Sequence, residues 1–153
     1  MTVARKEAHS GADVLTANVP RRQVAALCVR NTDLGARILL ITSRDTGRWV
    51  LPKGWIIKGL DEIGSAQQEA WEEAGVRKAK ADRTPVGTYH YDKRLRDGTS
   101  VPVQVSVFKM AVKKISDEFP EMKQRNREWF PAKDAARLVD EPELKQLLRQ
   151  FPN

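Results

Sequence analysis

The segment from Gly54 to Val76 constrains this chain more than any other, because it places three carboxylates on one face of a short predicted helix. Glu69, Glu72 and Glu73 are spaced i, i+3 and i+4. At about 100° per residue they fall within roughly one third of the helix circumference. Three like charges on one patch repel each other, whereas divalent cations take oxygen ligands and cancel that repulsion. The pattern therefore predicts a site for divalent metal ions and a metal-dependent enzyme.

The length and composition of the chain limit its class. A chain of 153 residues suffices for one domain with its own core. No apolar run approaches the ~20 residues that a membrane span needs. The N-terminal stretch lacks the apolar core of a secretory signal. We therefore expect a flexible N-terminal arm over residues 1–20, a single domain over 21–153, and no contact with a membrane.

The only cysteine of the chain, Cys28, excludes an internal disulfide and fits the reducing cytoplasm, which is the predicted location. It lies in an apolar, strand-like run, which favours a buried and inert thiol over a reactive one.

The net charge of +7 and the isoelectric point near 9.8 favour anionic partners. The basic residues are spread along the chain without a dense block, which favours a small phosphorylated substrate over duplex DNA. A nucleic-acid partner is the less favoured alternative, and it would show binding that weakens steeply with salt. Monomer and homodimer both stay open.

Hydrophobic patterning predicts a mixed-sheet α/β domain in layers. Strands are expected over residues 23–30, 37–43, 48–51, 101–108 and 128–130, with one or two more within 79–94. A glycine-punctuated loop is expected from residue 54, a charged loop over 113–127, and terminal helices over 131–139 and 141–151. The acidic helix is predicted to start at Ile63 or Ser65, with Ser65 as a plausible cap, and to stop at Gly75. Its inward stripe, Ile63, Ala66, Ala70 and Ala74, is predicted to consist mostly of small residues, and a hairpin-type turn is predicted at Asp97-Gly98.

The residues of the acidic helix resemble the Nudix box, which reads Gly, five residues, Glu, seven residues, then Arg-Glu-apolar-x-Glu-Glu-x-Gly-apolar. The matching residues, at the right spacing, are Gly54, Glu69, Ala70, Glu72, Glu73, Gly75 and Val76. Arg127 to Phe130 and the run from Leu39 to Pro52 look like the diphosphoinositol and diadenosine polyphosphate hydrolase branch. The resemblance implies a Nudix-type α/β/α sandwich with a central mixed sheet and C-terminal helices.

Two residues depart from the box. Leu60 replaces its first glutamate, and Gln68 replaces the arginine that the resemblance associates with orienting the catalytic carboxylates. Asp61 and Glu62 lie next to Leu60, so a small loop shift would supply a substitute carboxylate. These departures motivate an alternative function, a catalytically weakened Nudix-fold binding or sensing module for phosphorylated ligands.

The leading interpretation is a pyrophosphohydrolase that cleaves a phosphoanhydride bond in a nucleoside- or inositol-linked di- or polyphosphate by attack of a metal-activated water. Glu69, Glu72 and Glu73 are the expected ligands of Mg²⁺ or Mn²⁺. The resemblance adds a backbone carbonyl from Lys53 or Gly54. It also implies that the general base comes either from the box helix or from a later loop.

For that loop base the candidate is Glu121, with a solvated surface glutamate as an equal alternative. Candidate phosphate-binding residues are Arg22, Arg44, Lys53 and Lys58, and for each of them a plain surface charge is the alternative. We expect His90 and Trp71 to pack. For Trp55, stacking on a base and simple loop packing are evenly balanced.

Overall fold

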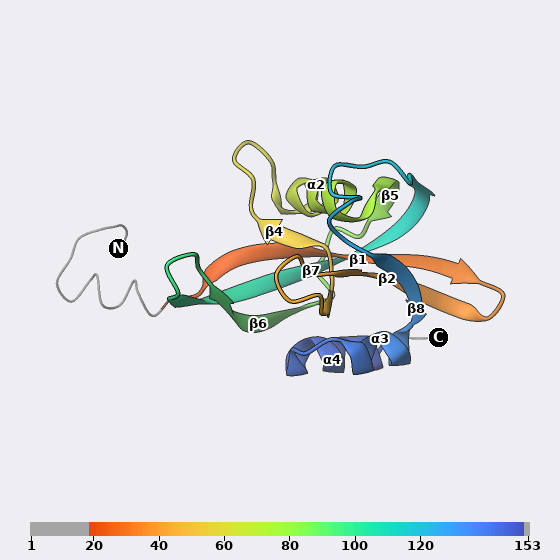
Figure 1. Cartoon of the computed structure of the whole chain (residues 1–153). Helices are drawn as coiled ribbons and strands as arrows, with labels where there is room; N and C mark the ends of the chain where they lie inside the picture. The colour runs from red at the N-terminus through yellow and green to blue at the C-terminus, as the bar shows by residue number, and fades with distance from the viewer. Residues whose placement is uncertain (1–18, 152–153) are drawn as a thin grey trace.

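The structure, a computed structural model, describes residues 19–151, so the arm predicted over 1–20 lies outside the described residues except for its last two. One mixed sheet of eight strands separates two helical layers (Figure 1). Helix α2 (Glu62–Ala74) covers one face, and α3 (Ala132–Leu138) with α4 (Pro142–Arg149) covers the other. The predicted α/β sandwich with C-terminal helices is confirmed.

The sheet is built around two long strands. Its strands are β1 (Arg21–Thr32), β2 (Gly35–Thr42), β3 (Trp49–Val50), β4 (Lys53–Trp55), β5 (Val76–Ala81), β6 (Gly87–Arg94), β7 (Ser100–Ile115) and β8 (Arg127–Pro131). The main order is β3-β2-β1-β7-β5, while β4 pairs with β1, β6 with β7 and β8 with β2. Among the described strands, β1 and β7 run parallel and the other pairs are antiparallel.

Strand β1 is buried on both faces, as its nearly continuous apolar sequence requires. Along Val24–Val29 alternate side chains enter two separate cores, because successive side chains of a strand point to opposite faces. One core lies under α2 and contains the buried free thiol of Cys28, as predicted. The other lies under α3 and α4 and contains Leu27 and Tyr89.

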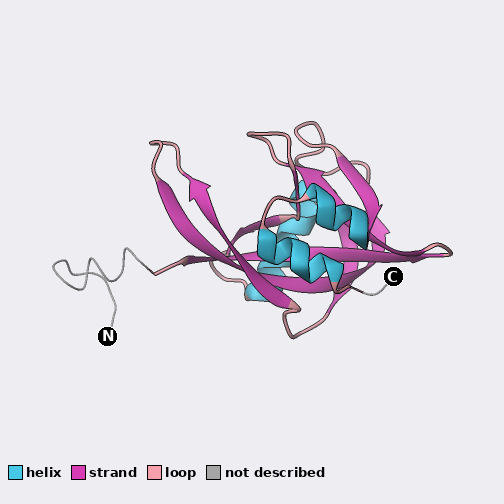
Figure 2. Ribbon diagram, turned by 90° about the horizontal axis from the view of Figure 1, so that it is seen from below, coloured by secondary structure: helices cyan, strands magenta, loops and turns pink. Residues whose placement is uncertain are grey.

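Helix α2 lies close to the sheet because its inward residues are small. Ala66, Ala70 and Ala74 are fully buried, which confirms the predicted inward stripe. On the opposite face α3 and α4 lie side by side across the sheet (Figure 2), and larger side chains, including Leu144 and Leu148, fill the space beneath them.

The start of α2 differs from the prediction. The helix begins at Glu62, and Asp61 is its cap, because the Asp61 carboxylate accepts a hydrogen bond from the Gly64 N–H at 2.6 Å. Ser65 is buried instead, and its hydroxyl accepts from the Ile57 N–H at 2.9 Å, which fixes the preceding loop. The predicted stop is confirmed, since Gly75 has the left-handed φ of 75° at the helix end.

Several predicted boundaries were wrong. Lys53–Trp55, predicted as loop, forms β4, because it pairs with the exposed edge of β1 at Gln23–Ala25. Strand β7 continues to Ile115, into the predicted charged loop, because β5 pairs with it there. The last helix ends at Arg149 rather than near residue 151.

A long hairpin, β6–β7, projects from the body at the left of Figure 2. Its turn contains Asp97 and Gly98, as predicted, and Gly98 has a φ of 89° that favours glycine. Pro102 pairs with β6 one residue before β7 begins to pair with β1 at Val103, so its missing N–H interrupts no central ladder.

Candidate active site

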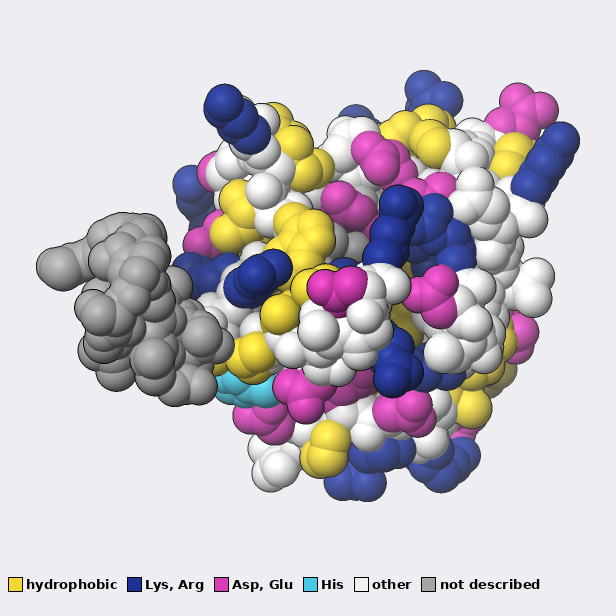
Figure 3. Space-filling model, turned by 60° about the vertical axis from the view of Figure 1, so that its left-hand side comes forward, with side chains coloured by type: hydrophobic (Ala, Val, Ile, Leu, Met, Phe, Trp, Pro, Cys, Tyr) yellow, Lys and Arg dark blue, Asp and Glu magenta, His cyan; other side chains and the backbone are white. Residues whose placement is uncertain are grey.

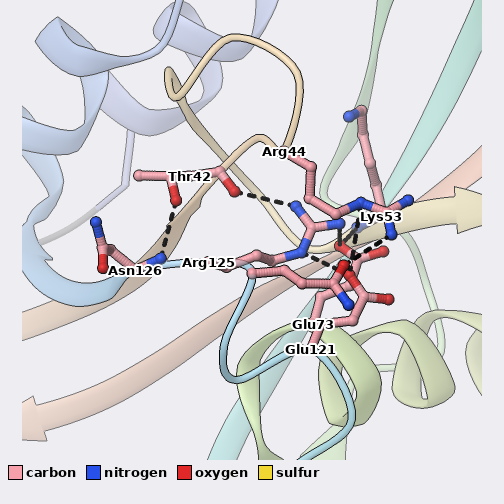
Figure 4. A network of polar contacts seen from close by, with 8 residues as sticks. Thr42, Arg44, Lys53, Glu73, Glu121, Arg125 and Asn126 are labelled. Atoms are coloured by element: carbon pink, nitrogen blue, oxygen red, sulfur yellow. Dashed lines mark hydrogen bonds and ion pairs between the residues drawn. The ribbon is translucent and has the colours of Figure 1, made fainter.

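A hollow of about 460 Å³ opens on the α2 side of the sheet. Three elements meet there, namely β4, α2 and the loop of residues 116–126, which connects β7 to β8 (Figure 4). Of the predicted catalytic carboxylates, the hollow is lined by Glu69, Glu73 and Glu121. The fold therefore brings Glu121 to two acidic residues that lie about 50 positions earlier in the sequence.

Glu69 and Glu73 form the centre of the site, since they lie one turn apart on α2 and both line the hollow. Glu73 is only 7% exposed and accepts a hydrogen bond from the Lys53 N–H at 3.2 Å. Burial raises the pKa of Glu73 well above its usual range, and the contact with Glu69 adds to this rise. Burial also raises the pKa of Glu69. Two adjacent carboxyl groups with raised pKa values form a place where positive charge is favoured.

Strand β4 lies directly against this pair at Gly54. A side chain at this position would place its Cβ 2.5 Å from the Glu69 Cδ, well inside van der Waals contact. Only a glycine lets the backbone of β4 approach the Glu69 carboxylate this closely. The backbone of Lys53 and Gly54, predicted to supply a carbonyl ligand, therefore borders the carboxylates.

Glu72 lies apart from the pair and does not line the hollow. Its Oε2 accepts a hydrogen bond from the Gln68 Nε2 at 2.6 Å. Its backbone carbonyl accepts from the Glu121 N–H at 2.9 Å. Glu72 thus fixes the position of the 116–126 loop on α2, while its side chain is held by Gln68.

The predicted loop carboxylate, Glu121, does reach the site, and it arrives with a partner that sequence reasoning missed. Arg125 donates from its Nε to the Glu121 Oε1 at 2.7 Å and from its Nη1 to the Thr42 carbonyl at 3.0 Å. Its Nη2 lies 3.8 Å from the Glu73 Oε1. The only signal in the sequence is the i, i+4 spacing of Glu121 and Arg125, which nothing distinguishes from other pairs in this charged loop.

Two of the four predicted phosphate-binding residues line the hollow, and the other two lie outside it. Arg44 and Lys53 line the hollow, and Arg44 lies 4.0 Å from Glu121. Burial lowers the pKa of Lys53 to about 8, and its Nζ lies 5.1 Å from the centre of the Tyr91 ring. Arg22 instead pairs with Glu62 at 3.1 Å in a separate hollow.

Lys58 is exposed on the loop before α2 and does not line the hollow. The aromatic candidates and His90 are also placed. Trp55 lines the hollow and is 38% exposed, whereas Trp71 faces another hollow, where Arg77 lies over its ring. His90 is exposed rather than packed, and its ring lies 3.0 Å from Glu143 of α4.

A second hollow of about 520 Å³ adjoins the first and shares Lys53, Tyr91 and Lys93 with it. Its other basic residues are Arg48, Arg94 and Arg96. Arg48 is engaged by Glu141 at 3.0 Å and by Asp140 at 3.6 Å. The second hollow also contains two carboxylates, Asp45 and Asp92, so its lining has an excess of basic residues but is not purely basic. Figure 3 shows one face of the molecule, on which basic and acidic side chains are interspersed.

The carboxylates of the hollow provide part of the ligand set that a divalent cation needs. Glu69 and Glu73 are carboxylates held together at the cost of raised pKa values, and hard cations prefer such oxygen ligands. Within residues 19–151, however, no three His, Cys, Asp or Glu side chains are already gathered around one point. The two Glu residues are thus the core of a site that other groups would have to complete.

The fold and the groove define a class, an α/β sandwich enzyme with an acidic helix bordering its cavity. The NUDIX domain matches residues 19–151, and the chain belongs to this family. It is a Nudix-type hydrolase acting on phosphorus-containing acid anhydrides. The predicted family resemblance is confirmed.

Named relatives agree with the family, and solved structures agree with the fold. Diphosphoinositol polyphosphate phosphohydrolase 3-alpha of Mus musculus is 28% identical over 121 residues, which are 78% of this chain and 69% of the relative. The fold is similar to that of C. elegans Ap4A hydrolase, with a TM-score of 0.63, 22% identity, and coverage of 87% of this chain and 96% of that one. It is also similar to the E. coli dihydroneopterin triphosphate pyrophosphohydrolase, with a TM-score of 0.64, 18% identity, and coverage of 85% and 93%.

In the described part of the chain, no helix is long and apolar enough to cross a membrane.

Proposed function

We propose that this hydrolase cleaves a phosphoanhydride bond in a nucleoside- or inositol-linked di- or polyphosphate, with Mg²⁺ or Mn²⁺ as its cofactor. The observation that carries the proposal is the pair Glu69 and Glu73, one turn apart on α2, in a hollow that adjoins a second one with an excess of basic residues. A diphosphate bridge is anionic on both sides, so cleaving it requires positive charge around the phosphates and a water held in line.

Glu69 and Glu73 would hold the cation, with Glu72 and a backbone carbonyl of Lys53 or Gly54 as further ligands. When bound, the cation supplies positive charge to the phosphate oxygens and activates water. Glu72 is at present bonded to Gln68, so a change of its side-chain rotamer would be needed for it to contribute.

The remaining side chains of the hollow bind the substrate and handle protons. Lys53 and Arg44 line the cavity and can contact phosphate oxygens. Glu121 is held against the cavity wall and can accept a proton from the attacking water. Trp55 lines the cavity partly exposed, where a base could stack on it.

The adjoining basic hollow favours polyphosphorylated substrates over simple diphosphates. Lys93, Arg94 and Arg96 line it, and basic side chains there would contact phosphates distant from the bond that is cleaved. The relatives named for diphosphoinositol polyphosphates support the same substrate class.

A substrate screen tests the proposal. It compares ADP-ribose, nucleoside triphosphates, diadenosine polyphosphates and a diphosphoinositol polyphosphate, each with Mg²⁺, with Mn²⁺ and with EDTA. We expect hydrolysis that needs the metal and is fastest for a substrate with several phosphates. Absence of turnover on every compound, or turnover undiminished in EDTA, would overturn the proposal.

A second candidate function is a Nudix-fold module that binds phosphorylated ligands with little turnover. Two observations favour it. Gln68 stands where the box has an arginine, and Leu60, in place of the first box glutamate, is 44% exposed. The suggested substitutes are engaged elsewhere, since Asp61 caps α2 and Glu62 pairs with Arg22. Stabilisation against thermal unfolding by a screened compound, without product, would favour this function.

A further inference from the structure

The acidic cluster lacks the fixed positive charge that the Nudix box would give it. Gln68 occupies the position of the box arginine, and its neutral amide donates to Glu72 at 2.6 Å. Glu69, Glu73 and Glu121 nevertheless share the same hollow. Gathering carboxylates in a partly buried place is unfavourable unless a cation compensates them.

Arg125 provides such a cation from a different part of the chain. Its side chain is only 9% exposed, and its guanidinium contacts three elements, as Figure 4 shows. It bonds the Thr42 carbonyl at the end of β2 and Glu121 in its own loop, and it lies 3.8 Å from Glu73 on α2. A mobile surface side chain would not be held at three points in this way.

The loop that carries Arg125 is itself fixed at both sides of the site. The Glu121 N–H donates to the Glu72 carbonyl at 2.9 Å. At the other end Asn126 and Thr42 are joined by two hydrogen bonds, from the Asn126 N–H to the Thr42 hydroxyl at 2.9 Å and from the Thr42 N–H to the Asn126 carbonyl at 3.0 Å. The guanidinium is therefore placed by the backbone and not by the carboxylates alone.

Arg44, the other cation near Glu121, is a poorer candidate for this role. Its side chain is 56% exposed, its Nε lies 4.0 Å from the Glu121 Oε1, and it donates to the Gln124 side chain at 3.0 Å. No contact between Arg44 and Glu73 is shorter than the ion-pair limit among the described residues.

We propose that Arg125 is a positioning residue that supplies, from the 116–126 loop, the positive charge missing at position 68, and that it holds Glu73 and Glu121 in their working arrangement. Its planar fork suits this role, because one group must serve two carboxylates and a carbonyl at once. The chain has thus moved an orienting cation from the acidic helix to a loop more than 50 residues later. For its activity this inference rests on the proposed hydrolase function.

The test uses four variants of the full chain, Arg125→Gln, Arg125→Lys, Gln68→Arg and the double variant Gln68→Arg/Arg125→Gln. Turnover of ADP-ribose and of diadenosine tetraphosphate is measured with Mn²⁺. We expect Arg125→Gln to lower kcat by about 10- to 100-fold, the usual effect of losing a residue that orients metal-binding carboxylates, with little change in KM. Arg125→Lys keeps the positive charge and loses the planar guanidinium. Its decrease in kcat should therefore be the smaller one, about tenfold.

The double variant tests most directly whether an arginine at position 68 can replace Arg125. Position 68 directly precedes Glu69 and lies one turn before Glu72, so an arginine there would again face the carboxylates. We expect Gln68→Arg to recover about tenfold in kcat in the Arg125→Gln protein, and to change the wild type much less. Lys123→Gln, an exposed residue of the same loop, is the matched control and should keep wild-type kinetics.

Thermal unfolding in EDTA gives a readout independent of turnover. Arg125→Gln should lower Tm by about 5 °C, and the double variant should regain part of this loss, because the carboxylates again have a cation nearby. If Arg125→Gln fails to fold, Arg125→Lys is compared with the double variant Gln68→Arg/Arg125→Lys instead, by the same measurements of kcat and Tm.

Three results would overturn the proposal, namely an unchanged kcat in Arg125→Gln, a raised KM with unchanged kcat, or a double variant no better than Arg125→Gln. The second would make Arg125 a substrate ligand instead. A wild type that hydrolyses neither compound would count against the proposed function, and the unfolding comparison would still decide the role of Arg125.

Discussion

The two faces of the sheet are filled in different ways. Under α3 and α4 the core contains large apolar side chains such as Leu144 and Leu148, and it includes Tyr89. Under α2 the inward residues are alanines, and the buried set of that helix also includes Ser65 and Glu73. The comparison teaches that one face mainly stabilises the fold, whereas the other gives up apolar packing to hold polar groups at the site.

The largest expected effect is on turnover, from the face of α2. Glu73→Gln keeps the shape of the side chain and removes its charge, so hydrolysis should fall by about 10³-fold, or roughly 4 kcal/mol in the barrier. The metal-free variant should be as stable as wild type or more so, because a buried carboxylate is gone. Steady-state kinetics and urea unfolding measure the two quantities. Glu62→Gln, at a residue outside the hollow, is the control. Full activity in Glu73→Gln would refute the idea that the α2 face carries the activity and the other face mainly stability.

The opposite face should show the reverse pattern. Leu148 is fully buried beneath α4, and Leu148→Ala should reduce the free energy of unfolding by about 3 kcal/mol through a lost side chain and a cavity. Its kcat, measured well below the unfolding transition, should match wild type. Leu138→Ala, at a residue 37% exposed on α3, is the control and should cost far less. A large change in kcat for Leu148→Ala would show that the faces are coupled.

A third substitution probes the contact between β4 and the acidic helix. Gly54→Ala would place a methyl group 2.5 Å from the Glu69 Cδ, so the carboxylate must shift. We expect kcat/KM to fall about tenfold, or roughly 1.4 kcal/mol, with a smaller effect on stability. Leu60→Ala, exposed in the loop that follows β4, provides the comparison. Unchanged kinetics would mean that Glu69 can move freely without loss of function.

The smallest effect is a dependence of stability on pH. The pKa of Glu73 is raised in the folded protein, so its contribution to stability is complete below about pH 4.5 and is lost as the pH rises toward the folded value. In EDTA the free energy of unfolding should therefore decrease by roughly 1 kcal/mol over the first pH unit above pH 5, because one proton corresponds to at most about 1.4 kcal/mol per pH unit. Lys53, whose pKa is lowered to about 8, has the opposite effect at higher pH, so the measurement stays below that value.

Urea unfolding of wild type and Glu73→Gln across this range tests the assignment. The slope should be smaller in Glu73→Gln. An equal slope in both proteins would assign the titration to another group.

Local patterns predicted much of the fold. The alternation around Val103 gave a strand, and the small residues Ala66, Ala70 and Ala74 gave the inward face of α2, because both follow from the period of the element. The strand at Lys53–Trp55 was missed because it is short, contains a glycine and depends on the edge of β1. Ser65 was a plausible cap by type, but its burial against Ile57 could not be read from neighbouring residues.

The candidate site was also predictable from the sequence only in part. Glu69 and Glu73 were predictable, since both lie on one helix with a fixed spacing. Arg125 was not, because its role depends on a loop that folds back over α2 and on a carbonyl of β2. Arg22 is the reverse case, since its charge suggested phosphate binding and the fold placed it beside Glu62, outside the hollow. A charge acquires its role from the elements around it, which one sequence does not show.

The parallel pairing of β1 and β7 has a consequence for how the protein folds. Arg21 lies opposite Val103, so the central ladder closes only after 82 further residues have been added. Such distant pairing is slow, because the entropy of closing a long loop must be overcome before the contacts form. The groove needs this ladder on one side and the 116–126 loop on the other. A nascent chain therefore contains the sequence of its acidic helix well before the groove around that helix can be completed, and hydrolysis would report the completion of folding.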